Sequence, residues 1–297
     1  MRGGGILGIE LRRSAAPWAG AIFLLAALAF LYLLSGPWWK GTTAMTAQWT
    51  SAAQWERFLL LFLWPLVVAA GAVQGMRDRR SAMTELLATT PRPAAARAAR
   101  AAGSLAIALA AGYLLVFLHN AAWVVARGGA FHLNWLPILL VGVLAMAAGG
   151  LIGMGVGRAL PSPLTPPAAA VAALVALIFL FLLQVRGEAG QASGMPIRLS
   201  LLSPALPQVR DEFATIAGPV HLGQAVWLAG LAAAGIVLLL ATRARTRLLA
   251  LPLLGLAAAV ALALLPASFA AITTVNRTVS DLVCEGRVCL SRLHQNR

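Results

Sequence analysis

Residues 164–185 read LTPPAAAVAALVALIFLFLLQV, a run of 22 residues without a charged side chain. An α-helix needs about 20 apolar residues to cross the roughly 30 Å hydrocarbon core of a bilayer. A helix that is apolar on every side has no face to present to water. We therefore predict that this stretch spans a membrane.

Segments of the same kind lie on both sides of this run. They cover residues 17–36, 58–76, 102–126, 135–157, 222–242 and 247–270. Of the 297 residues, 60% are hydrophobic and 11% are charged, at a mean hydropathy of +0.84, whereas soluble domains have about 25% charged residues. The sequence predicts an all-α, polytopic membrane helix bundle, in which a six-span core over residues 17–243 precedes a seventh span.

The net charge of +14 comes from basic residues that lie between the apolar segments. This distribution is typical of the positive-inside bias of membrane loops and argues against a nucleic-acid surface, which would gather the charges on one polar face. With the N-terminus inside, the inner side carries 13 Lys and Arg and the outer side 10, with Arg57 and Glu56 counted outside. We predict a multi-pass protein of the inner or plasma membrane, with its C-terminus outside.

Four pieces of the chain are not expected to span. Residues 1–16 place apolar side chains at helical spacing beside arginines, which favours an interfacial helix on the membrane surface. Residues 77–101 form the longest inner loop, and residues 186–221 form a long outer loop rich in proline and apolar residues. Residues 271–297 form a polar outer tail.

No catalytic or cofactor-binding pattern stands out. The four histidines have no paired zinc-ligand spacing and the chain has no Walker A loop, so we expect no metal, cofactor or ATP site within it. The glycine-rich run at 149–157 fits close helix packing, because small residues at four-residue spacing let membrane helices approach each other. The polar residues expected near span ends are Gln74, Gln184, His119 and Asn120. We expect no acidic residue inside a span, unlike in proton pumps and ion-coupled carriers.

The chain has two cysteines, Cys284 and Cys289, both in the predicted outer tail. A disulfide is chemically permitted on the outer side of a cell membrane. The four residues between the cysteines can form a turn around Gly286. We predict a local disulfide, with two free thiols as the alternative.

Residues 78–91 read DRRSAMTELLATTP and come directly after the second predicted span. The apolar residues Met83, Leu86 and Leu87 fall on one helical face, the arginines lie towards the opposite side, and the proline ends the helix. A short amphipathic helix should therefore project just inside the membrane. A helix lying on the membrane surface and a docking helix for a cytosolic partner both fit, and both remain open at this point.

The same stretch resembles the segment after the second span in permeases of the ABC-2 exporter type. That pattern is an acid, a short polar run, a small residue and then Glu-Leu-Leu-Leu-Ala-Thr-Pro; here Thr89-Thr90-Pro91 stands where Thr-Pro is usual. The layout over residues 1–243 is similar too, since the family has an N-terminal interfacial helix, six spans and an outer loop that partly re-enters the membrane. The resemblance assigns residues 195–207 to that re-entrant part, and the seventh span and tail are additions.

This resemblance implies a transport subunit, not an enzyme, that pairs with a second permease chain and a separate cytosolic ABC ATPase. The residues that it places against the ATPase are Asp78, Arg79, Arg80, Met83, Glu85, Leu86 and Leu87. The apolar spans suggest an apolar or amphipathic cargo, such as a lipid, a peptide or a drug. Two other classes stay open: a membrane enzyme on lipid-linked substrates, using Asp211 and Glu212 near His221, and a non-transporting sensor or scaffold.

Overall fold

The computed structural model of the protein describes residues 16–33, 48–77, 94–129, 131–206, 214–241, 243–275, 282–285 and 288–291. Within these residues, seven helical segments are long and apolar enough to cross a membrane. They are α2 (Ala16–Leu33), α3 (Trp49–Gly75), α6 (Ala94–Ala126), α7 (Leu136–Ala159), α8 (Thr165–Glu188), α10 (Gly218–Leu240), and the consecutive α11 (Ala244–Arg247) and α12 (Ala250–Leu264), which count as one. The prediction of an all-α polytopic helix bundle is confirmed, and the protein is a multi-pass membrane protein.

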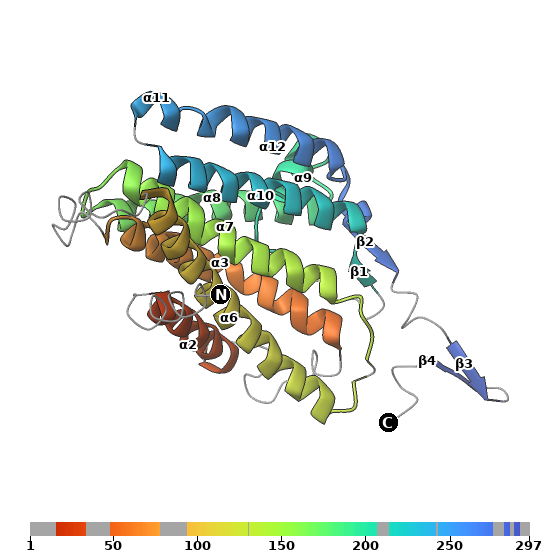
Figure 1. The fold of residues 1–297 in the computed structure, drawn as a ribbon. Coiled ribbons are helices and arrows are strands. Elements are labelled where there is room, and N and C mark those ends of the chain that lie inside the picture. The colour runs from red at the N-terminus through yellow and green to blue at the C-terminus, as the bar shows by residue number, and fades with distance from the viewer. Residues whose placement is uncertain are drawn as a thin grey trace.

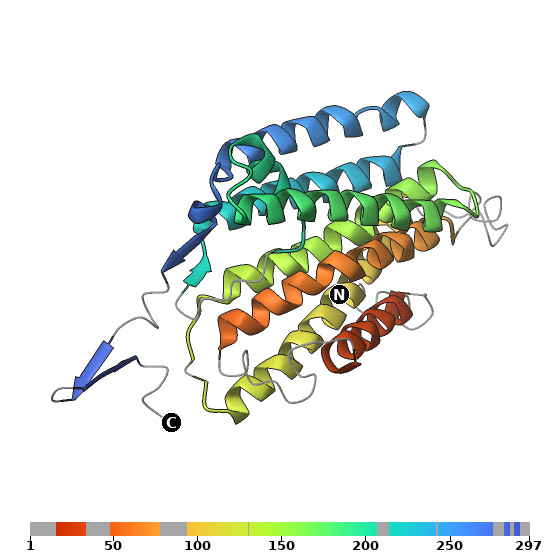
Figure 2. The same cartoon turned by 180° about the vertical axis from the view of Figure 1, so that it is seen from behind.

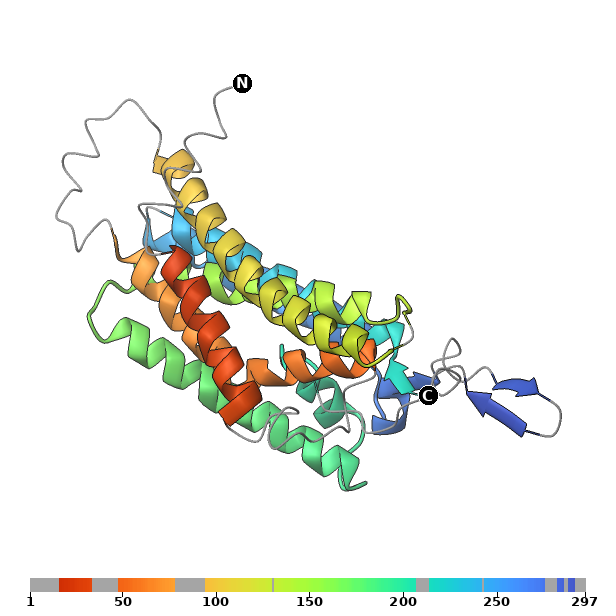
Figure 3. The same ribbon diagram turned by 90° about the horizontal axis from the view of Figure 1, so that it is seen from below.

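Helix α7 lies at the centre of the bundle, with α3 on one side and α10 on the other (Figure 1). Helix α12 packs on α10 and α2 packs on α6, at opposite edges of the bundle, as the reverse view also shows (Figure 2). Seen from below, α8 and α6 lie on opposite sides of α3 (Figure 3). The peripheral helices α2, α8 and α12 bury few of their side chains within the bundle, which suits contact with lipid tails.

Glycines bring α3 and α7 into backbone contact. A Cβ added at Gly71 or Gly75 of α3 would collide with carbonyl oxygens of α7, and one added at Gly153 or Gly157 would collide with those of α3. Within each helix these glycines are four residues apart, so they share one face. The prediction that the run 149–157 serves close helix packing is confirmed.

The two ends of the bundle differ in charge. Helix α11 and the connection between α7 and α8 lie at one end (left in Figure 1), and strands β1 and β2 lie at the other. The described arginines at the first end, which we call the arginine-rich end, are Arg77, Arg97, Arg100, Arg158, Arg243, Arg245 and Arg247. The described charged residues at the opposite end, outside the buried interior, are Arg127, Arg186, Arg198, Glu188 and, in the strand at 282–285, Glu285. This difference agrees with an arginine-rich end inside the cell, and the orientation stays a prediction.

The long connection between α8 and α10 folds onto the end opposite the arginine-rich end. It contains the short helix α9 (Met195–Ser200) and strand β1 (Ala214–Ile216), which pairs antiparallel with β2 (Thr273–Val275) beyond α12. The Gly194 backbone N–H also donates to the Ala267 carbonyl (2.6 Å). The connections after α8 and after α12 are therefore held together. The remaining described elements are η2 (Phe269–Ile272), β3 (Leu282–Glu285) and β4 (Val288–Ser291).

Two helices begin earlier than hydropathy predicts. Helix α3 begins at Trp49 rather than near 58, and α6 begins at Ala94 rather than near 102. Glu56 and Arg57, which we placed in an outer loop, therefore lie inside a candidate membrane-spanning helix. The prediction that no acidic residue lies within a span is wrong. The interfacial helix expected at residues 1–16 lies, except for Ala16, outside the described residues.

Candidate functional site

Arg57 is a fully buried arginine that contacts three other parts of the chain. Its Nε donates to the Pro204 carbonyl (2.9 Å), and its two terminal nitrogens donate to the Ile138 carbonyl (3.2 Å) and to Oε1 of Gln224 (3.1 Å). Pro204 follows α9, Ile138 lies in the first turn of α7, and Gln224 lies in the second turn of α10. One guanidinium therefore holds α3, α7, α10 and the connection after α9 together.

Gln224 extends this network to two more carbonyls. Its Nε2 donates to the carbonyls of Leu201 (3.1 Å) and Ser203 (3.0 Å), while its Oε1 accepts from Arg57. The side chain is 1% exposed. A buried amide must satisfy both its donor and its acceptor, because unpaired polar groups away from water are costly. The network thus fixes the connection after α9 at several points.

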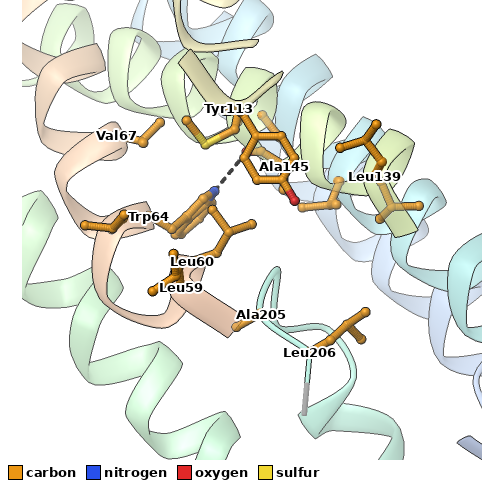
Figure 4. Close-up of a cluster of buried hydrophobic side chains, with 14 of the residues drawn as sticks. Leu59, Leu60, Trp64, Val67, Tyr113, Leu139, Ala145, Ala205 and Leu206 are labelled. Atoms are coloured by element: carbon orange, nitrogen blue, oxygen red, sulfur yellow. Dashed lines mark hydrogen bonds between the residues drawn. The ribbon is translucent and has the colours of Figure 1, made fainter. Parts of the chain in front are cut away.

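The segment 201–206 reaches into the bundle rather than lying across its end. All six of its residues are buried. Figure 4 shows the end of this segment in the same apolar cluster as Leu59 and Leu60 of α3. Arg57, which binds the segment, lies eight residues from the start of α3, or about 12 Å along the helix axis. This depth fits the re-entrant loop expected at 195–207, whose place in a bilayer stays a prediction.

Glu56 and Tyr113 share this buried region with Arg57. Both side chains are almost fully buried, and each interacts electrostatically with Arg57. Among the described residues, neither carboxylate oxygen of Glu56 nor the Tyr113 hydroxyl has a hydrogen-bond partner. Ionisable residues within membrane helices are costly and usually mark functional sites. We therefore take Glu56, Arg57, Tyr113 and Gln224 as the candidate functional site and call them the buried polar cluster.

Aromatic side chains cover the same end of α3. Trp49 stacks on Trp135 with ring centroids 5.6 Å apart, and Trp135 stacks on Phe117 at 4.8 Å. His132 lies close by, with its Nε2 3.5 Å from the Thr50 hydroxyl oxygen, and burial lowers the pKa of His132 below its usual value. Such aromatic groups are typical of the membrane–water interface, and this one anchors the first turn of α3.

Helix α3 connects the buried polar cluster with the arginine-rich end. It is a single helix of 27 residues, about 40 Å long, and the described chain continues from it to Arg77. Near its middle, Nε1 of Trp64 donates to the Ala145 carbonyl of α7 (2.9 Å; Figure 4). Beyond Pro65, the glycine contacts lock α3 against α7. The half of α3 that leads to the arginine-rich end is therefore packed directly against the backbone of α7.

The residues that the ABC-2 resemblance places against an ATPase all lie outside the described residues. They are Asp78, Arg79, Arg80, Met83, Glu85, Leu86 and Leu87. The structure fixes where their segment starts and stops, since it leaves the described chain at Arg77 and rejoins it at Ala94, both at the arginine-rich end. The docking role of these residues stays a prediction.

The two cysteines lie in a β-hairpin. Strands β3 and β4 pair antiparallel, with Cys284 directly opposite Cys289 in the backbone register. Directly opposed residues of an antiparallel pair have Cα atoms about 4.5–5.5 Å apart, which is a span that disulfides bridge. The backbone is thus compatible with the disulfide, which stays a prediction.

Of the three residues that a membrane enzyme would use, His221, Asp211 and Glu212, one lies among the described residues. His221 is buried near the start of α10, whereas Asp211 and Glu212 lie outside the described residues. Another histidine, His119, has its Nε2 2.6 Å from the Tyr32 hydroxyl oxygen. Within the described ranges, no three His, Cys, Asp or Glu side chains lie close enough to hold a metal ion.

The buried polar cluster was not predicted from the sequence. Hydropathy assigned Glu56 and Arg57 to a loop, because charged residues end an apolar window. A helical signal is nonetheless present upstream, where Trp49, Ala52 and Ala53 are spaced as one helical face. The partner glutamine on α10 gave no signal of its own, because its role depends on contacts between segments that are distant in sequence.

No family model, curated protein or solved structure matches the chain. The protein is a multi-pass membrane protein in which helix α3 leads from the buried polar cluster to the arginine-rich end.

Proposed function

We propose that this chain is the permease subunit of an ATP-driven exporter of the ABC-2 type. It works with a separate cytosolic ATPase and a second permease chain, and it moves an apolar or amphipathic cargo. Three features support the proposal: the sequence at 78–91, the six apolar helices that precede α11, and the connection after α9 that folds into the bundle.

The path of α3 is the observation that carries the proposal. A permease without an ATP site must transmit movement from its cytosolic surface to the far side of the membrane. Helix α3 leads from Arg77, next to the proposed docking segment, to Arg57, which binds the connection after α9. Its inner half is locked to α7 by the glycine contacts, so a push on the docking segment displaces both helices together.

Replacing Leu86 and Leu87 by Asp tests the docking role. The permease is co-expressed with a candidate ABC ATPase from the same genome, and the complex is purified through a tag on the permease. We expect the double variant to lose the ATPase, because each Asp would bring an unpaired charge into an apolar contact. Retained ATPase and unchanged ATP turnover would reject the proposal.

A matched control replaces Leu248 and Leu249 by Asp. These residues form an exposed leucine pair between α11 and α12, at the same end of the bundle but outside the docking segment. The control variant should retain the ATPase. If the purified chain instead transforms a lipid-linked substrate without any ATPase, the alternative of a membrane enzyme is supported.

A further inference from the structure

Helices α6 and α10 both pack on α7, and a half-open groove remains between them. Its volume is about 260 Å³, and Ala99, Gly103, Leu151 and Leu240 are among the residues that line it. The small residues of α6 create the space, since a Cβ added at Gly103 would meet no atom within 4 Å. Every lining side chain is apolar or absent, so the part of a ligand that enters must be apolar as well.

The size of the groove favours a flexible chain over a compact ligand. Sites for small molecules commonly measure about 300–1,000 Å³ and add a few polar groups that fix orientation. This groove is smaller and lacks such groups. It lies between candidate membrane-spanning helices, where lipid acyl chains are the surrounding apolar molecules.

Three arginines of the arginine-rich end follow lining residues of the groove in sequence. Arg100 directly follows a lining residue of α6, and Arg243 lies three residues beyond the last lining residue of α10. Arg158 lies seven residues after Leu151, on the same face of α7. The starts of α6 and α11 lie at this same end of the bundle (Figure 3). Among the described residues, this end holds no Asp or Glu.

We infer that the groove is a binding site for an anionic membrane phospholipid. One acyl chain occupies the space between α6 and α10, and the phosphate group is bound by Arg100 and Arg243. Arg243 is exposed, and Arg100 uses its Nε to bind the Ala96 carbonyl (3.0 Å). Basic pockets between helices on the cytoplasmic side of a membrane are typical sites for acidic headgroups.

Each half of the site excludes a different ligand. A zwitterionic phospholipid fits the groove but carries no net charge to match the arginines. A free phosphate ion matches the arginines but leaves the groove empty. A bound lipid braces α6 against α10, so it should stabilise the fold. This site does not depend on the transport function proposed above.

Thermal unfolding of the full chain in detergent tests the site. The probe is phosphatidylglycerol with two oleoyl chains, and phosphatidylcholine with the same chains is the reference. We expect phosphatidylglycerol to stabilise the protein at lower concentration than phosphatidylcholine does. Arg100→Gln and Arg243→Gln should each weaken the apparent affinity by about fivefold. Gly103→Leu should abolish the preference, because the new side chain fills the groove.

Two matched control variants distinguish loss of lipid binding from nonspecific effects of the substitutions. Gly255→Leu adds the same side chain on α12, where an added Cβ also meets no atom within 4 Å, and Arg186→Gln removes a charge at the opposite end. Both should respond as the unmodified chain does. Equal stabilisation by the two lipids, an unchanged response of Gly103→Leu, or the same stabilisation by inorganic phosphate alone would each overturn the inference. If Gly103→Leu does not fold, the two arginine variants decide.

Discussion

At the scale of single residues, Arg57 combines a charge with a fixed geometry. Its three hydrogen bonds reach Pro204, Ile138 and Gln224, on segments that approach from different directions. The planar guanidinium presents several donors in a rigid arrangement, whereas the ammonium group of a lysine is a single point of charge. The buried polar cluster therefore needs the shape of the arginine as well as its charge.

We predict that Arg57→Leu destabilises the chain by about 3–5 kcal/mol, because the change orphans buried acceptors and leaves Glu56 without its neighbouring positive charge. Arg57→Lys should recover only part of that loss. Reversible unfolding in mixed detergent micelles measures both values. Arg186→Leu, which alters an exposed arginine, serves as the control and should change the stability by less than about 0.5 kcal/mol.

A double variant separates the two causes of this loss. One cause is the burial of the Glu56 carboxylate without the positive charge of Arg57. If this cause contributes, adding Glu56→Gln to Arg57→Leu should restore part of the stability, because a neutral amide costs less to bury than a carboxylate. Full stability of Arg57→Lys would instead show that charge alone matters, against the geometric argument.

At the scale of elements, hydropathy located all seven candidate spans but misplaced the start of two helices. Helix α6 begins early because residues 94–101 are mostly alanine, the best helix former, and their two arginines do not interrupt a helix that extends past the lipid. The early part of α3 contains Arg57, whose guanidinium is bound by three distant segments and can therefore be buried. The alanine content that extends α6 can be read from the local sequence, whereas the distant contacts of α3 cannot.

The same limit applies to the candidate site. The pattern at 78–91 predicts an amphipathic helix, because the spacing of its apolar residues is local information. The contact between Arg57 and Pro204 joins residues 147 positions apart, and no local pattern encodes it. The buried charge of Arg57 was therefore found only from the structure, which shows that α3 begins before this residue.

The contact between α3 and α7 gives a prediction at this scale. A Cβ at Gly153 would collide with the Val68 carbonyl of α3, so Gly153→Ala should force the two helices apart. We expect a loss of about 1–3 kcal/mol, the usual cost of overpacking. The control is Gly103→Ala on α6, where the added methyl group meets open space. It should be neutral or slightly stabilising, since alanine favours a helix.

Thermal unfolding of the two alanine variants, measured side by side in the same detergent, provides the comparison. A Gly153→Ala chain as stable as the Gly103→Ala chain would contradict the tight α3–α7 contact. It would also weaken the argument that α3 and α7 move as one unit.

At the scale of the whole molecule, the two ends of the bundle differ in charge, and this difference predicts how the bundle is oriented in the membrane. Seven crossings predict that the start of α2 and the end of α12 lie on opposite sides of a membrane. The turn between α10 and α12 carries Arg243, Arg245 and Arg247, whereas the β3–β4 hairpin follows α12. The positive-inside rule predicts that the turn lies in the cytosol and the hairpin outside, which is the arrangement that the proposed ATPase contact requires.

Cysteine labelling in intact cells tests this direction together with the disulfide. Cys284 and Cys289 face each other across the hairpin backbone, so a membrane-impermeant maleimide should label them only after an impermeant reductant opens the bond. A second chain carries Thr246→Cys in the inner turn, with both native cysteines changed to Ser. That single introduced thiol should stay unlabelled until the cells are permeabilised.

The two chains separate the orientation from the disulfide. Labelling of the introduced thiol in intact cells would place the arginine-rich end outside, and an ATPase could then not reach the docking segment. Labelling of the native pair before reduction would reject the disulfide while leaving the orientation intact, because outer thiols are accessible whenever they are not bridged.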